Sequence, residues 1–192
     1  MVDRVRTLLR ELRPSLAAAG VLGLLSTLGD WIWARFIPDG AVLPGVIHGV
    51  LVFLILALIL GLAAKSRTAL RRLLLSLPIA GLLLAAAFYP LAHVLGYLGA
   101  LLATWIAMWL TLALLQRWAR DHTEAVQRAL LRGLVAAVAS GLAFWAVSGI
   151  WTDPTIQTSY LLRVVYWTFA FFPGFLALLW AQPPGAFQHM IA

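Results

Sequence analysis

Residues 41–64 read AVLPGVIHGVLVFLILALILGLAA, a stretch without a single acidic residue, lysine or arginine. The hydrocarbon core of a bilayer is about 30 Å thick, and a helix needs roughly 20 apolar residues to cross it. The stretch meets that requirement, so it predicts a transmembrane helix. The rest of the chain is therefore interpreted with the bilayer as its solvent.

The overall composition points the same way. Of the 192 residues, 63% are apolar and 11% are charged, whereas charged residues make up about 25% of a typical soluble domain. A soluble globular class is therefore excluded. The chain contains no cysteine, which excludes disulfides, Cys-ligated zinc, iron–sulfur clusters and thiol nucleophiles.

Apolar runs of spanning length occur six times, and they predict an all-α, polytopic membrane bundle. The six transmembrane helices are expected at residues 14–36, 41–64, 73–92, 95–116, 129–151 and 160–181. Only a short segment around HVLGY separates the third helix from the fourth, and Pro90, Gly96 and Gly99 indicate that the chain turns there.

The predicted domain organisation has three parts. Residues 1–13 form a cytoplasmic N-terminal segment, residues 14–181 the six-helix domain and residues 182–192 a cytoplasmic tail. The N-terminal segment spaces valine and leucine along one helical face, so it is expected to lie on the membrane surface as an amphipathic helix. A disordered tail is the alternative.

The positions of the basic residues predict the orientation. Twelve of the fourteen lie on one side of the predicted bundle, namely Arg4, Arg6, Arg10, Arg13, Lys65, Arg67, Arg71, Arg72, Arg117, Arg120, Arg128 and Arg132. By the positive-inside rule this side is cytoplasmic, and both termini belong to it. Thirteen of the fourteen basic residues are arginine, a bias associated with GC-rich bacterial genomes. The expected location is a bacterial plasma (inner) membrane.

The formal net charge of +7 does not indicate a nucleic-acid partner. The basic residues form three short groups next to the predicted helices, and not one basic patch interleaved with exposed aromatic residues. Anionic headgroups of membrane lipids are the simpler partner for such groups.

Small residues spaced four apart predict close helix packing. They occur at Gly45 and Gly49, at Gly133 with Ala137 and Gly141, and at Gly96 with Ala100. This spacing lets helix backbones approach each other closely inside a membrane. Packing within the chain is the first interpretation, and a homo-oligomer interface is the alternative.

Asp30 is an aspartate inside the predicted first helix, which makes it the leading site candidate. It lies about 9 Å below the outer end of that helix at 1.5 Å per residue, and His48 lies at a similar depth on the second helix. A carboxylate–imidazole pair is therefore plausible. Arg163, near the outer end of the last helix, is the other candidate partner. Such a cluster either fixes helix packing or handles a ligand headgroup or a proton.

Two aromatic residues, Trp105 and Trp109, lie four apart near the middle of the predicted fourth helix. They either pack in the bundle or line an apolar pocket. Pro78 and Pro173 lie inside the predicted third and sixth helices, where proline disrupts regular hydrogen bonding and kinks the helix. Kinks of this kind make room between helices.

Known catalytic arrangements do not fit this chain. Ser148 lacks the first glycine of the rhomboid-type Gly-x-Ser-Gly motif, and the predicted last helix contains no histidine. The four histidines, His48, His93, His122 and His189, are isolated from one another, so no metal site or cofactor is expected. The sequence therefore predicts a protein that is not an enzyme.

The segment Gly149 to Trp167, GIWTDPTIQTSYLLRVVYW, resembles the Gly-aromatic, Thr-x-Pro, Tyr-x-Arg, Trp progression into the last helix of the insulin-induced gene (Insig) family. The matching positions are Gly149, Trp151, Thr152, Pro154, Tyr160, Arg163 and Trp167. Length, span number and topology also agree with that family. The resemblance implies a lipid-sized ligand in a cavity between helices, without catalysis. The family's third-helix signature has no counterpart here beyond Ala92-His93, so no protein partner is implied.

Two functional hypotheses follow. The first is a non-enzymatic integral membrane protein that binds a lipid or sterol-like ligand, such as a diacylglycerol-type lipid, between its helices. The candidate ligand-binding residues are Asp30, His48, Trp105, Trp109, Tyr160 and Arg163. The second is an intramembrane enzyme or small transporter subunit that uses a polar cluster of Asp30, His48 and Arg163.

Overall fold

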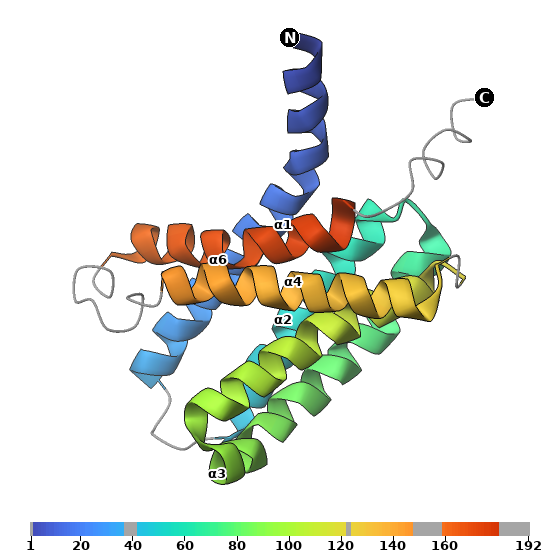
Figure 1. The fold of residues 1–192 in the computed structure, drawn as a ribbon. Coiled ribbons are helices and arrows are strands. Elements are labelled where there is room, and N and C mark those ends of the chain that lie inside the picture. The colour runs from blue at the N-terminus through green and yellow to red at the C-terminus, as the bar shows by residue number, and fades with distance from the viewer. Residues whose placement is uncertain (1, 37–41, 122–123, 148–158, 181–192) are drawn as a thin grey trace.

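The computed structural model describes residues 2–36, 42–121, 124–147 and 159–180, and every regular element in these ranges is an α-helix. The helices are α1 (Val2–Phe36), α2 (Val42–Ala63), α3 (Arg67–Ala119), α4 (Val126–Ala146) and α6 (Tyr160–Trp180) (Figure 1). Each of these five contains a stretch that is long and apolar enough to cross a membrane. The structure is thus that of a multi-pass membrane protein.

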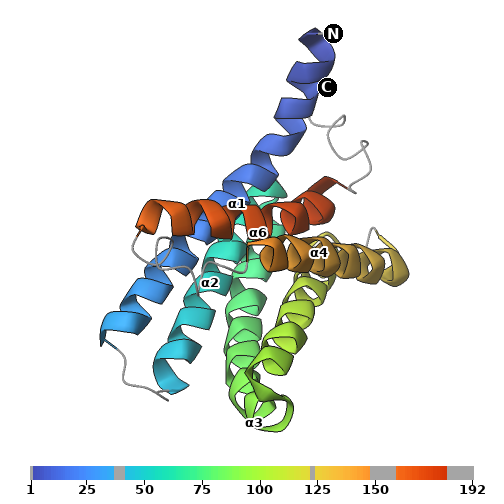
Figure 2. The same ribbon diagram turned by 60° about the vertical axis from the view of Figure 1, so that its left-hand side comes forward.

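Helix α3 is a hairpin of two helical legs. Its backbone leaves helical geometry at Gly96, where φ is 72° and ψ is 167°, a region that is essentially open to glycine alone. The ribbon reverses its direction, and the two legs lie side by side in both views (Figures 1 and 2). The two ends of α3 therefore meet. Near its start, Arg72 Nη1 donates to two carbonyl oxygens near its end, those of Trp118 at 3.3 Å and Ala119 at 3.4 Å.

The two legs cover the segments that were predicted as the third and fourth helices. Helix α3 runs through Pro78 and Pro90 with helical dihedral angles and reverses at Gly96. Of the turn residues suggested by the sequence, Gly96 is thus the one that makes the reversal. Helix α1 likewise runs without interruption through Pro14, so the predicted N-terminal amphipathic segment and the first predicted transmembrane helix form one continuous helix.

Helices α1, α6 and α4 pack together as one group. Ser15 Oγ of α1 lies 3.4 Å from the carbonyl oxygen of Phe175 in α6, and a Cβ placed on Gly23 would lie 2.6 Å from Thr168 Oγ1. Ser140 Oγ of α4 donates to the carbonyl oxygen of Ala170 at 2.9 Å. Helices α4 and α6 lie side by side in Figures 1 and 2.

Helix α2 packs closely on the first leg of α3 through small residues. A Cβ on Gly49 would lie 2.7 Å from the Cβ of Ala85, and a Cβ on Gly81 would lie 2.7 Å from the carbonyl oxygen of Gly49. On α4, a Cβ at Gly133 would lie 3.0 Å from the Cα of Leu110. Gly49 and Gly133 thus serve packing within the chain, as their spacing suggested, whereas a Cβ on Gly96 would meet nothing within 4 Å.

The chain connections lie at two ends of the bundle. The C-terminus of α1, the N-terminus of α2 and the turn of α3 lie together at the lower end in both views (Figures 1 and 2). At the opposite end, Arg132 near the start of α4 donates to the carbonyl oxygen of Leu178 near the end of α6. The basic groups at residues 65–72 and 117–132 lie at this second end.

Candidate functional site

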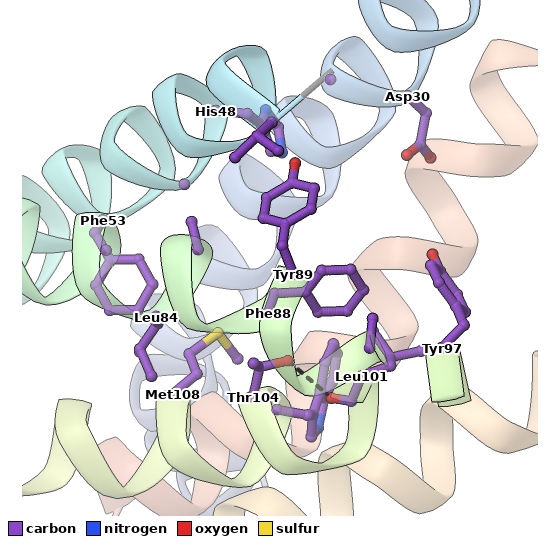
Figure 3. Close-up of a pocket in the computed structure, with 18 of the residues that line it drawn as sticks. Asp30, His48, Phe53, Leu84, Phe88, Tyr89, Tyr97, Leu101, Thr104 and Met108 are labelled. Atoms are coloured by element: carbon purple, nitrogen blue, oxygen red, sulfur yellow. Dashed lines mark hydrogen bonds between the residues drawn. The ribbon is translucent and has the colours of Figure 1, made fainter. Parts of the chain in front are cut away.

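A cavity of about 830 Å³ lies between α1, α2 and both legs of α3 (Figure 3). Its volume falls in the range of about 300–1,000 Å³ that is typical of small-molecule sites. It is lined by Gly29, Asp30, Val42, Gly45, His48, Gly49, Phe53, Gly81, Leu84, Ala85, Phe88, Tyr89, Ala92, His93, Tyr97, Leu101, Thr104, Trp105 and Met108.

The cavity exists because α1 diverges from α2. Helix α1 packs along α6 and touches α2 only slightly, whereas α2 packs along α3. The close contact between α1 and α2 is made by Gly29, since a Cβ there would lie 2.0 Å from Cε1 of His48. Small residues such as Gly45 and Ala92 contribute little volume to the cavity walls. The space between the helices therefore stays open.

One part of the cavity is apolar. Phe53 of α2 and Leu84, Leu101 and Met108 of α3 face it (Figure 3). The Thr104 hydroxyl donates to the carbonyl oxygens of its own helix, at 2.8 Å for Ala100 and 3.1 Å for Leu101. This part of the cavity suits a hydrocarbon body, because its one hydroxyl is already satisfied.

The other part of the cavity is polar. Figure 3 shows the Asp30 carboxylate of α1 above the hydroxyl end of Tyr97, and the Tyr89 hydroxyl pointing toward the His48 ring. Carboxylate, imidazole and phenol groups from three helix segments thus converge at one end. The cavity has the character of an amphipathic site, with a polar head region and an apolar body.

Asp30 is held by the last helix. Its Oδ2 accepts a hydrogen bond from Trp167 Nε1 at 3.0 Å. Arg163 lies one helical turn before Trp167, and its positive charge attracts the carboxylate. The negative charge of Asp30 also interacts with the Tyr97 hydroxyl. The sequence pointed to His48 or Arg163 as the partner. The direct hydrogen-bond donor is Trp167, while the His48 ring packs on the backbone of Gly29.

Trp167 belongs to an aromatic cluster that reaches the cavity wall. Its ring is stacked with Phe144 at a centroid distance of 5.6 Å and with Phe171 at 5.5 Å. Trp105 is stacked with Phe171 at 5.3 Å and tilted against Phe144 at 5.4 Å. Since Trp105 lines the cavity, the cluster connects the cavity wall to the residue that holds Asp30.

The six candidate residues divide into three groups. Asp30, His48 and Trp105 line the cavity. Arg163 is not among the lining residues and acts on Asp30 from α6.

The remaining two candidates lie elsewhere. Trp109 is fully buried and packs edge-on against Phe175 at 5.3 Å, with its ring over Gly174. Tyr160 is 52% exposed at the start of α6. Of the two tryptophans, Trp105 thus faces the cavity and Trp109 the bundle core.

Comparison with protein-family models, with curated proteins and with solved structures finds no match to this chain. The likeness to the Insig family therefore stands on the residues quoted for it. Gly149, Trp151, Thr152 and Pro154 lie outside the described residues. Tyr160, Arg163 and Trp167 lie on α6. Of these, Trp167 donates a hydrogen bond to the cavity-lining residue Asp30.

A second polar cluster surrounds Arg132 at the other end of the bundle. Its Nη1 donates to Gln116 Oε1 at 2.7 Å and to the carbonyl oxygen of Leu178 at 2.6 Å, and its Nη2 donates to Glu124 Oε2 at 2.7 Å. The Arg132 side chain is only 5% exposed. The sequence suggested a lipid headgroup as its partner, but this arginine instead ties α3, the α3–α4 connection and α6 together.

Helical periodicity could have located the Arg132 cluster. Ala129 and Ala136, three residues before and four residues after Arg132, are both buried, so the arginine lies on the inward face of α4. Trp167 likewise shares a face with Phe171 and Phe175, four and eight residues later. No comparable signal marks a metal site, and the described ranges contain no group of three His, Asp or Glu side chains that could hold one.

Proposed function

We propose that this protein is a non-enzymatic integral membrane protein that binds a lipid or sterol-like ligand in the cavity between α1, α2 and α3. The observation that carries the proposal is the division of this cavity into an apolar region and a polar end. A hydrophobic ligand with a small polar head would bury its hydrocarbon body against Phe53, Leu84 and Met108. Its head would lie beside Asp30, His48 and the two tyrosines.

The size of the cavity supports a ligand with a substantial apolar body. About 830 Å³ exceeds what an ion or a few water molecules need. Each methylene group transferred from water to an apolar site contributes about 0.8 kcal/mol, but a membrane lipid arrives from hydrocarbon and gains much less. Binding specificity must then come mainly from shape and from the polar end. The proposal agrees with the resemblance to the Insig family.

Mass spectrometry of lipids released from the purified protein tests the proposal. We expect a lipid at about one copy per protein in the wild type and its loss in Leu101→Trp, because the larger side chain would occupy the cavity. The matched control is Leu102→Trp, at the next residue of the same leg, which is 52% exposed and does not line the cavity. The wild-type protein without stoichiometric lipid, or equal lipid loss in both variants, would contradict the proposal.

The proposed topology has six membrane crossings with both termini in the cytoplasm. Helix α3 has 53 residues, and a single crossing needs roughly 20, so its two legs are each long enough to cross. The basic residues near the ends of α2, α3 and α4 favour a cytoplasmic location of that end of the bundle. The arginine-rich composition favours a bacterial plasma membrane. Cysteine labelling from either side of the membrane tests the topology.

A further inference from the structure

The first feature of the cavity lining is the sign of the charge that its residues carry. Among the residues that the structure describes, Asp30 is the one acidic residue of the lining, and no lysine or arginine of these ranges belongs to it. The other polar side chains of the lining belong to His48, His93, Tyr89, Tyr97 and Thr104. Apart from the two imidazoles, the carboxylate of Asp30 is therefore the one group of the described lining that can carry a full charge near neutral pH.

The groups that compensate Asp30 act from outside the lining. Trp167 donates to Oδ2 from α6, and Arg163 acts on the carboxylate electrostatically, also from α6. Neither residue belongs to the cavity wall. A ligand in the cavity would thus meet the carboxylate of Asp30, while Arg163 is not among the lining residues.

Aromatic rings surround this end of the cavity. Phe88 packs edge-to-face with Tyr89 at a centroid distance of 5.7 Å and with Tyr97 at 5.5 Å. All three rings belong to α3 and line the cavity, and the Tyr97 hydroxyl points toward the Asp30 carboxylate (Figure 3). Aromatic faces attract cations through their quadrupole, and such rings beside a carboxylate are a typical site for an amine or a quaternary ammonium group.

We propose that the ligand of this cavity carries a positively charged amine or ammonium head on an apolar body, with Asp30 as its counter-charge. This inference rests on the proposed function and names the chemical class of the ligand. The head group would lie between Asp30 and the rings of Phe88, Tyr89 and Tyr97. The apolar body would extend toward Phe53, Leu84 and Met108.

The two other classes of head group fit this lining less well. An anionic head would lie beside Asp30 without a lysine or arginine in the described part of the cavity wall, and like charges repel strongly where water is scarce. An uncharged hydroxyl head could donate a hydrogen bond to the carboxylate. It would gain neither the charge–charge attraction nor the attraction to the aromatic faces.

Three probes with the same hydrocarbon chain separate these classes. Oleylamine, oleyl alcohol and oleate differ only in the head group, which is cationic, neutral or anionic. Their binding is measured by native mass spectrometry and competition on the full-length protein in uncharged detergent, at about pH 8, where free imidazole is neutral. We expect oleylamine to bind about tenfold more tightly than oleyl alcohol, and oleate to bind most weakly.

The variant Asp30→Asn identifies the source of the preference. Asparagine keeps a carbonyl oxygen that can accept from Trp167 but lacks the charge. We expect its affinities for oleylamine and oleyl alcohol to become nearly equal, and binding of oleyl alcohol also shows that the variant is folded. Asp121→Asn is the matched control, since Asp121 pairs with Arg72 at the opposite end of the bundle. It should keep the tenfold preference.

The outcomes separate this inference from the proposed function. If the wild type binds the amine and the alcohol equally well, or prefers oleate, the inference is overturned while lipid binding stands. If the preference survives in Asp30→Asn, Asp30 is not the counter-charge, and the inference is overturned as well. If none of the three probes binds to the wild type, both this inference and the proposed function fail.

Discussion

Trp167 has two roles that depend on different parts of the same side chain. Its indole N–H donates to Asp30, and its ring stacks on Phe144 and Phe171. A carboxylate inside a membrane is costly unless a partner is supplied, so the indole donor stabilises Asp30 in its position beside the cavity. The stacked ring in turn has little freedom to rotate, which fixes the direction of the donor.

The variant Trp167→Phe keeps an aromatic ring and removes the donor. A hydrogen bond to a charged group contributes about 1.5–3 kcal/mol, so we expect a loss of free energy of unfolding in this range. Thermal unfolding in detergent measures the change. Trp105→Phe is the control, because Trp105 Nε1 has no hydrogen-bond partner within the described part of the chain. Equal losses in the two variants would show that the Trp167 hydrogen bond contributes nothing.

At the scale of the element, α3 depends on a single residue. Both legs keep helical geometry, and the reversal occurs at Gly96 with its positive φ. Pro90 marks a possible helix end in the sequence, but proline is accommodated within the first leg. The reversal brings Tyr97 and Trp105 of the second leg to the same cavity as Leu84 and Phe88 of the first.

Replacing Gly96 by alanine tests the hairpin. No atom would come within 4 Å of the added Cβ, so steric contact with neighbours does not contribute. The strain of this backbone region costs about 1–3 kcal/mol for a residue other than glycine, and we expect Gly96→Ala to lower the free energy of unfolding by that amount.

Gly20→Ala in α1 is the matched control, because its Cβ would also meet nothing within 4 Å and its φ is not positive. Alanine is the better helix former by about 0.5–1 kcal/mol, so this control should show no loss of stability. Both variants are compared by thermal unfolding in the same detergent. A Gly96→Ala variant as stable as the wild type would contradict a strained turn at this position.

At the scale of the whole molecule, the hairpin is the basis for proposing six membrane crossings. With α3 folded in two, its ends meet through Arg72 and the backbone of residues 118–119. The turn of α3 then lies at the end of the bundle where α1 ends and α2 begins (Figures 1 and 2). The proposed six-crossing topology would place these two ends on opposite sides of a membrane.

Single cysteines test this topology in a chain that has none of its own. Val94→Cys lies near the turn of α3 at a position that is 80% exposed, and Ala125→Cys lies in the exposed connection before α4. We expect a membrane-impermeant maleimide to label the first from outside intact cells and the second only in inverted vesicles. A protease-sensitive tag at the N-terminus should behave like Ala125→Cys. Labelling of both cysteines from one side would contradict the six crossings.

The sequence by itself determined the class of the molecule. Uninterrupted apolar runs and few charges predict membrane-spanning helices, because a helix pairs its own backbone groups, which are too costly to leave unpaired in hydrocarbon. The same reasoning located Asp30 as a carboxylate inside the first predicted helix, with His48 at a similar depth on the second, and placed Trp105 near the middle of the fourth. Spacing of small residues identified Gly49 and Gly133 as close-packing positions. All of these are local properties of a single helix.

The tertiary structure alone decided which of these residues meet. Periodicity gives the inward face of one helix but not its rotation or distance relative to the next, and those depend on packing across the whole bundle. The cavity arises because α1 follows α6 and diverges from α2, which no single segment encodes. For the same reason Asp30 is held by Trp167, 137 positions later in the chain. Arg132 is buried among three segments of the chain and does not face lipid headgroups.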